Sequence, residues 1–136
     1  MTRSSRSRGR YAPGPMPERT ERLAIWLAAA QVVDAIGNSI PRRYVEAHLD
    51  HLGVPDRLRP ALPVIKVTTA GGLLVGLKLP RLGALTSAAL VAYYAAAVRF
   101  HMLSGDHPVL WIPAAVFGAG AAATLTNLYL PAIRPA

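Results

Sequence analysis

The sequence predicts an all-α integral membrane protein, built as an up-down bundle of four helices with both termini in the cytoplasm. The hydrophobic fraction is 52%, and only 16% of residues are charged, whereas soluble domains carry about 25%. No Lys, Arg, Asp, Glu or His occurs in residues 82–98 or 109–133. Each run is roughly long enough to cross a hydrocarbon core about 30 Å thick. Neither run has a polar face, so both are expected to contact lipid.

Residues 1–22 form an Arg-, Ser- and Pro-rich tail that has too few apolar residues to fold alone. We predict a disordered cytoplasmic segment that sets the topology and contacts anionic lipid. A nucleic-acid-binding arm is the alternative interpretation. Only Tyr11 provides an aromatic ring there and no folded nucleic-acid reader follows, so we expect no nucleic-acid partner.

The membrane domain is expected over residues 23–133 and begins with two spans that each contain a charge. The first span is predicted at 23–40, ending before Pro41, and the second at 61–79, ending before Pro80. Asp34 interrupts the first and Lys66 the second. Such residues cost about 2.5–3.5 kcal/mol each at a helix centre, so these two spans should insert with help from the others.

The third and fourth spans are predicted at 82–102 and 108–130, leaving residues 134–136 as a cytoplasmic C-terminus. Pro108 suits a first helical position, and Pro113 suggests either a kink or a later start. Trp111 and Tyr129 lie near the ends of the fourth span, where aromatic residues commonly anchor a helix at the membrane interface.

The distribution of basic residues predicts the orientation. The N-terminal tail, the turn between the second and third spans, and Arg134 hold nine of the 15 Lys and Arg residues. The positive-inside rule places that side in the cytoplasm. Four spans agree with this count and three do not, because three would put Arg134 outside. We therefore predict a multi-pass protein of the cytoplasmic (inner) membrane.

The first outer loop contains a candidate interfacial helix. Residues 42–52 place Val45, Leu49 and Leu52 at helical spacing, opposite charged residues. Gly53 follows, where a left-handed helix terminus is common. We expect a short amphipathic helix lying in the outer membrane interface.

The candidate site is a polar layer near the outer ends of the spans. Asp34 and Lys66 fall at matching depth, about 8 Å below the interface at 1.5 Å per residue, and ionisable residues in spans often mark a site. We hypothesise an outward-facing ligand-binding pocket formed by Asp34, Asn38, Lys66, Arg99 and His101. It could bind a quinone or a lipid head group, or relay protons.

The alternative is a structural ion pair, either Asp34–Lys66 or Asp34–Arg99, that neutralises buried charge. The outer histidines also include His48 and His51, three residues apart, but that spacing indicates polar interface residues more than a metal site. We assign no metal ligands and no catalytic residues. The chain has no cysteine, which excludes disulfides and CxxC redox motifs.

Four sequence features together resemble the pattern of the DoxX-like family of small four-helix bacterial membrane proteins. Gly53 and Pro55 precede the second span, and Lys66 then precedes the glycine-rich segment GGLLVGL. A proline-containing turn follows, and the third span ends with His101 before Gly-Asp. The resemblance covers residues 53–106, whereas the first and fourth spans are similar in length only. Several relatives carry an acidic residue where this chain has Lys66.

The resemblance implies an accessory or anchoring subunit of a quinone-linked membrane redox complex, with no catalysis by the chain alone. No cofactor is assigned, although a quinone is compatible with the resemblance. Expected partners are membrane lipids and either other membrane subunits or further copies of the chain. Two alternatives stay open: a protein that binds a small molecule, quinone or lipid head group in the polar pocket, and a structural or assembly protein without chemistry of its own.

Overall fold

The computed structural model describes residues 16–37 and 39–135, and every regular element in that part of the chain is a helix. The fold class predicted from the sequence is therefore confirmed as all-α. The elements in chain order are α1 (Met16–Gly37), α2 (Arg42–His51), the 3-10 turn η1 (Asp56–Leu58), α3 (Ala61–Gly76), α4 (Pro80–Leu103), α5 (Pro108–Thr124), the π-helical segment η2 (Leu125–Tyr129) and α6 (Leu130–Ile133).

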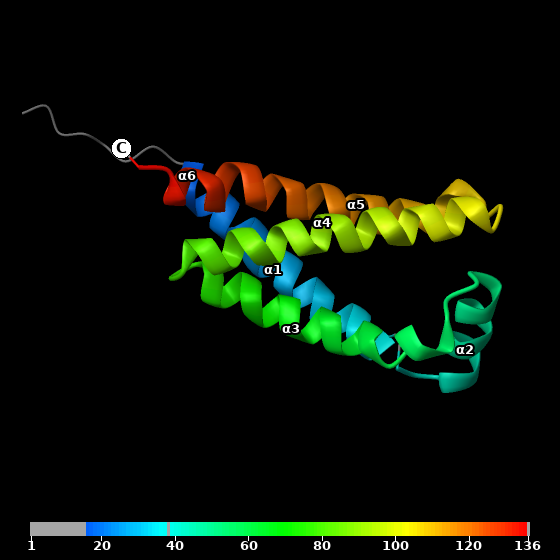
Figure 1. The fold of residues 1–136 in the computed structure, drawn as a ribbon. Coiled ribbons are helices and arrows are strands. Elements are labelled where there is room, and N and C mark those ends of the chain that lie inside the picture. The colour runs from blue at the N-terminus through cyan, green and yellow to red at the C-terminus, as the bar shows by residue number, and fades with distance from the viewer. Residues whose placement is uncertain (1–15, 38, 136) are drawn as a thin grey trace, which may run out of the picture.

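The long helices form two packed pairs that diverge from one another. Helix α1 packs against α3 and α4 against α5, while α3 also contacts α4 and α1 contacts α5. Figure 1 shows the two pairs meeting at the turn between α3 and α4 and separating toward the other end, where α2 lies. This divergence leaves room between the pairs on the side of α2.

Within the described residues, three helical stretches are long and apolar enough to cross a membrane, namely Asp56–Gly76, Pro80–Leu103 and Pro108–Ile133. Helix α1 reaches that threshold only together with α2, from which it is bent by 101°. This result agrees with the expectation that the first span, which contains Asp34, inserts less readily by itself. The helix of the fourth predicted span begins at Pro108 and keeps Pro113 inside it.

Helix α1 begins seven residues before the predicted first span. Residues 16–22, assigned from the sequence to the disordered tail, form its first turns, and residues 1–15 lie outside the described part of the chain. Glu18 lies in the first turn, where an acidic side chain interacts favourably with the helix dipole. The charged residues that precede the apolar part of α1 therefore still belong to the helix.

Glycines allow the closest helix contacts. A Cβ atom on Gly76 would overlap the backbone of Gly83, and a Cβ atom on Gly83 would overlap the ring of Tyr129. The Tyr129 hydroxyl donates a hydrogen bond to the carbonyl of Leu73 at 2.7 Å, and the residue is only 1% exposed. The prediction that Tyr129 anchors the helix at the interface is therefore wrong, because the two glycines make a space that its ring fills.

Large apolar side chains cover the outside of the helices. Trp26 is 72% exposed, Leu85 69% and Val116 63%, and each lies on a different helix. Such an apolar exterior is stable where the surrounding medium is itself apolar.

Candidate functional site

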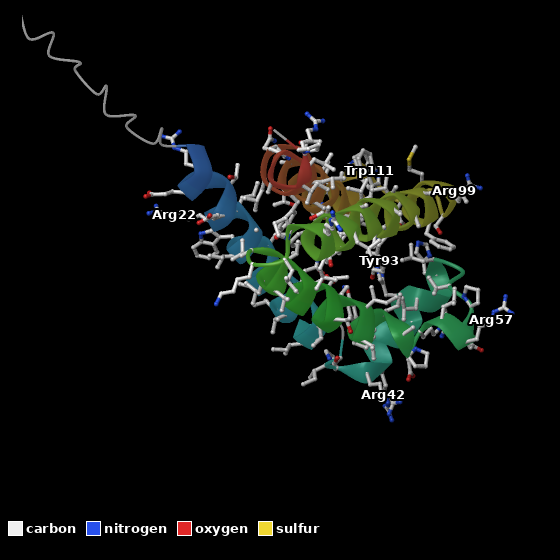
Figure 2. The ribbon with its side chains drawn as sticks, turned by 60° about the vertical axis from the view of Figure 1, so that its left-hand side comes forward. Arg22, Arg42, Arg57, Tyr93, Arg99 and Trp111 are labelled. Atoms are coloured by element: carbon white, nitrogen blue, oxygen red, sulfur yellow. The ribbon has the colours of Figure 1, made fainter. Side chains whose placement is uncertain are left out.

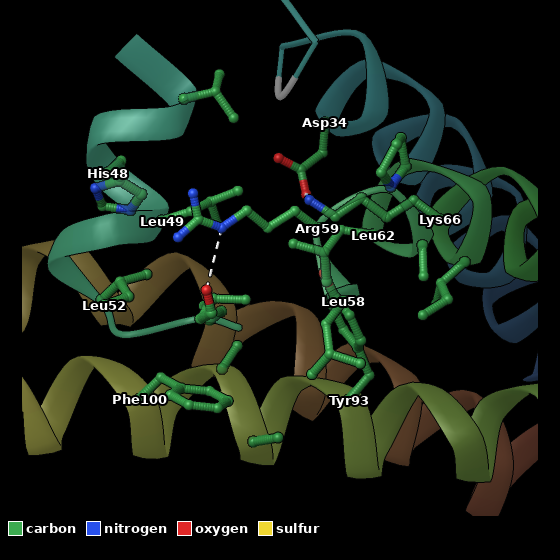
Figure 3. Close-up of a pocket in the computed structure, with 18 of the residues that line it drawn as sticks. Asp34, His48, Leu49, Leu52, Leu58, Arg59, Leu62, Lys66, Tyr93 and Phe100 are labelled. Atoms are coloured by element: carbon green, nitrogen blue, oxygen red, sulfur yellow. Dashed lines mark hydrogen bonds and ion pairs between the residues drawn. The ribbon is translucent and has the colours of Figure 1, made fainter. Parts of the chain in front are cut away.

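A cavity of about 980 Å³ occupies the space between the diverging helix pairs. Helices α1 and α3 form one wall, α4 and α5 form the opposite wall, and α2 with the following loop covers the end. Its apolar lining includes Leu49, Leu52, Leu58, Leu62, Phe100 and Phe117. Figure 3 shows α2 facing this space, with His48, Leu49 and Leu52 pointing toward it.

Asp34 and Lys66 form an ion pair on the α1–α3 wall. The two helices are packed neighbours, which brings the predicted residues of matching depth together. The Lys66 side chain is 7% exposed and that of Asp34 is 34% exposed. The ammonium group is thus buried against a carboxylate that reaches the cavity. Of the two pairings considered from the sequence, Asp34–Lys66 is the one that forms.

The other predicted site residues are distributed differently. His101 is 9% exposed and lines the cavity. Arg99 is exposed, and Figure 2 shows it pointing away from the helices at the far end of α4. Asn38 lies outside the described residues. The cavity therefore brings together Asp34, Lys66 and His101, whereas Arg99 belongs to the outer surface.

Asp106 connects the cover of the cavity to the α4–α5 wall. Its carboxylate contacts His51 Nε2 and His101 Nδ1, each at 2.6 Å. Ser104 Oγ also donates a hydrogen bond to the carbonyl of His51 at 3.3 Å. We call this group, His51, His101, Ser104 and Asp106, the histidine latch. It was not predicted, because His51 and Asp106 are 55 positions apart.

One group of the latch, Asp106, and one neighbour of the latch, His48, have shifted pKa values. Hydrogen bonds from His51 and His101 lower the pKa of Asp106 below its usual value of 3.8. Partial burial, helped by the nearby His101, lowers the pKa of His48 below 6.5. Within residues 16–37 and 39–135, no group of three or more His, Asp or Glu residues is arranged to hold a metal ion.

The apolar face of α2 covers the cavity. Val45, Leu49 and Leu52, predicted to face the membrane interface, all line the cavity. The helix has no buried residue, so it forms a thin cover and not part of a packed core. The amphipathic pattern of residues 42–52 therefore matches the cavity that these residues cover.

Arg59 reaches along the cavity from the start of α3. Its Nε donates to the carbonyl of Val54 at 3.1 Å, and its Nη2 lies 2.6 Å from Asp50 and 3.1 Å from Asp56. Figure 3 shows the side chain extending from the α3 side toward α2. No local sequence pattern distinguishes an arginine such as Arg59, which folds back onto its own loop, from a loop arginine that is solvated.

Two tyrosines and a glutamine add neutral polar groups. Tyr93 and Tyr94 both line the cavity, and their rings contact edge to face with centroids 5.2 Å apart. Gln31 Nε2 donates to the Tyr94 hydroxyl at 2.7 Å. An apolar cavity with a few converging polar groups is suited to binding a small amphipathic molecule.

Comparison with known families adds an independent observation. The family model described as the DoxX-like family matches residues 22–124, which is most of the chain and covers α1 from Arg22 onward and α3, α4 and α5 in full. No match was found among the curated proteins or among the solved structures.

Proposed function

This chain is a membrane protein of the DoxX-like family, and we propose that it binds an amphipathic small molecule in the cavity beneath α2. The single observation that carries this proposal is the cavity itself. Its volume, about 980 Å³, is at the upper end of the range of roughly 300–1,000 Å³ found for ligand sites. Apolar walls would hold a hydrocarbon part, and the polar groups would orient a head group.

The proposal is tested by filling the cavity from one wall. Ala97 lines it, whereas Ala92 on the same helix is exposed and does not. Amphiphiles retained by the protein after detergent purification are measured by native mass spectrometry. We expect the Ala97→Phe variant to lose the retained molecule and the Ala92→Phe control to keep it. Equal retention by the two folded variants would contradict binding in this cavity.

We further propose a four-span topology with both termini in the cytoplasm of a bacterium and the protein in the inner membrane. The support is the excess of Lys and Arg in the N-terminal tail, the turn after α3 and Arg134. In this orientation α2 and the histidine latch lie on the outer side. The cavity would then be reached from the outer leaflet or the outer aqueous phase.

A second candidate function is an accessory or anchoring subunit of a quinone-linked membrane redox complex. One observation favours a helix partner: Ala88, Ala92 and Ala95 are exposed along one face of α4, and small residues permit close helix association in membranes. Purification from the native membrane in mild detergent should then yield an assembly larger than one chain. Recovery of single chains under every mild condition would count against this role. A quinone is one amphipathic molecule of suitable size for the cavity.

A further inference from the structure

We infer that the cavity selects an uncharged amphiphile whose head group accepts hydrogen bonds, such as a glycerol ester, over an anionic one. This inference rests on the proposed binding function and specifies its ligand class. It depends on a head-group subsite, which we define as Lys66, Tyr93 and Tyr94 with Asp34 and Gln31 beside them.

The first line of support is the unused hydrogen-bonding capacity at this subsite. Lys66 is 6% exposed and donates to Asp34, so one of its three donors is used. The Tyr93 hydroxyl has no hydrogen-bond partner among the described residues, and the Tyr94 hydroxyl accepts from Gln31. These donors border the cavity, so a ligand that displaced water from them without supplying acceptors would lose about 1–3 kcal/mol for each. A ligand with carbonyl, ester or hydroxyl oxygens would supply acceptors.

The buried Gln31 beside this subsite also has an incomplete set of hydrogen bonds, but what it lacks is a donor. The residue is fully buried, and its Oε1 atom has no hydrogen-bond partner among the described residues. Its amide nitrogen is already used on Tyr94, which lines the cavity. Exchanging the amide oxygen and nitrogen would only move the shortage to the nitrogen. The polar groups behind this wall are thus incomplete within the described chain.

The second line of support is charge. Each cation that lines the cavity contacts a carboxylate: Arg42 with Glu46, Arg59 with Asp50 and Asp56, and Lys66 with Asp34. Among the described residues, a phosphate head group would therefore meet no uncompensated positive charge, and it would lie near Asp34. Bringing such an anion out of water without a cationic partner is unfavourable. An uncharged head group avoids this cost.

The remaining wall accommodates an acyl chain. Leu49 of α2 and Leu52, which directly follows this helix, face Phe100 of α4 across the space, as Figure 3 shows. An apolar chain along these residues would leave the oxygen-bearing end near Tyr93 and the Asp34–Lys66 pair, which border the same cavity from α4 and from α1–α3.

The test compares two lipids that differ only by a phosphate: 1-oleoyl glycerol and 1-oleoyl glycerol 3-phosphate. Binding of each to the full chain in detergent is titrated by native mass spectrometry. We expect the uncharged lipid to bind at least about tenfold more tightly, equivalent to roughly 1.4 kcal/mol. Tyr93→Phe removes one hydroxyl and should weaken binding of 1-oleoyl glycerol about fivefold.

Tyr44→Phe is the matched control, since Tyr44 is 72% exposed and does not line the cavity; its binding should equal that of the unmodified chain. Equal or tighter binding of the phosphate lipid would overturn the inference and leave the proposed function intact. Unchanged affinity in a folded Tyr93→Phe variant would also overturn it. Binding of neither lipid would overturn the proposed function as well. If Tyr93→Phe fails to fold, the ratio of the two affinities in the unmodified chain decides.

Discussion

The Asp34–Lys66 pair couples two helices through one buried contact. Lys66 is the more buried partner, because its side chain is 7% exposed and that of Asp34 is 34%. Removing one partner of a buried pair is more harmful than removing both, since it leaves an uncompensated charge. The pair can therefore be structural and also border the ligand site.

We predict that Asp34→Asn destabilises the protein more than Lys66→Met does. The first substitution leaves a buried ammonium without its carboxylate, at a cost of about 3 kcal/mol. The second leaves a carboxylate that water reaches in part. The double variant should recover stability relative to Asp34→Asn, because the two effects are coupled. Thermal unfolding in detergent, followed by Trp fluorescence, measures all three. Additive losses in the double variant would show that the two groups act separately.

The latch and its neighbour predict how stability depends on pH. The pKa of His48 is lowered from 6.5, so the folded state binds its proton less readily than the unfolded chain does, and stability falls as the pH drops below about 6.5. The pKa of Asp106 is lowered from 3.8, so a further loss follows as the pH drops below about 3.8. Both groups act in the same direction.

Unfolding temperatures recorded across this pH range test the two steps. His48→Gln should remove the step near neutral pH and keep the acidic one, whereas Asp106→Asn should do the reverse and lower stability at pH 7. A His48→Gln profile that retains the upper step would assign it to another group.

At the scale of elements, glycine decides how closely α3 and α4 approach. A Cβ atom on Gly76 would meet the backbone of Gly83, which cannot move without displacing a helix. Gly71 on the same helix has open space around its Cβ position. Gly76 and Gly71 therefore have the same helical backbone, but only Gly76 is in close contact with another helix.

We predict that Gly76→Ala destabilises the protein by about 1–3 kcal/mol through overpacking. Gly71→Ala should be neutral or stabilising by up to about 1 kcal/mol, because alanine favours the helix. Chemical or thermal unfolding of the two variants gives the comparison. Equal stability of the two variants would contradict this prediction, because it would mean that α3 and α4 can move apart at Gly76 without loss of stability.

At the scale of the whole molecule, the absence of cysteine makes topology directly measurable. Single cysteines at Arg57 and Lys78 replace exposed residues that lie beyond the two opposite ends of α3. With an impermeant maleimide on intact cells, we expect Arg57→Cys to be labelled and Lys78→Cys to be labelled only after lysis. Arg134→Cys should behave like Lys78→Cys. Labelling of Arg57→Cys and Lys78→Cys from the same side would contradict the proposed crossings.

Much of the fold could be predicted from the linear order of residues. Hydropathy runs, prolines at helix ends and the 42–52 pattern predicted all the long helices and α2, because these signals act within one or two helical turns. The depth of Asp34 and Lys66 followed from counting residues along neighbouring spans. The first residues of helices were less predictable. Helix α1 begins at Met16, because the helical backbone extends toward the N-terminus beyond the apolar stretch.

By itself, the sequence determined the helices, the apolar exterior suited to a membrane and the two charges at matching depth. Only the tertiary structure decided which groups meet: that Lys66 pairs with Asp34 while Arg99 points outward, that Tyr129 is buried, and that Asp106 joins two histidines. It also decided that the apolar side of α2 covers a cavity. The physical reason is that these contacts depend on the rotation and divergence of whole helices. Packing between residues distant in sequence sets both, and no local pattern records them.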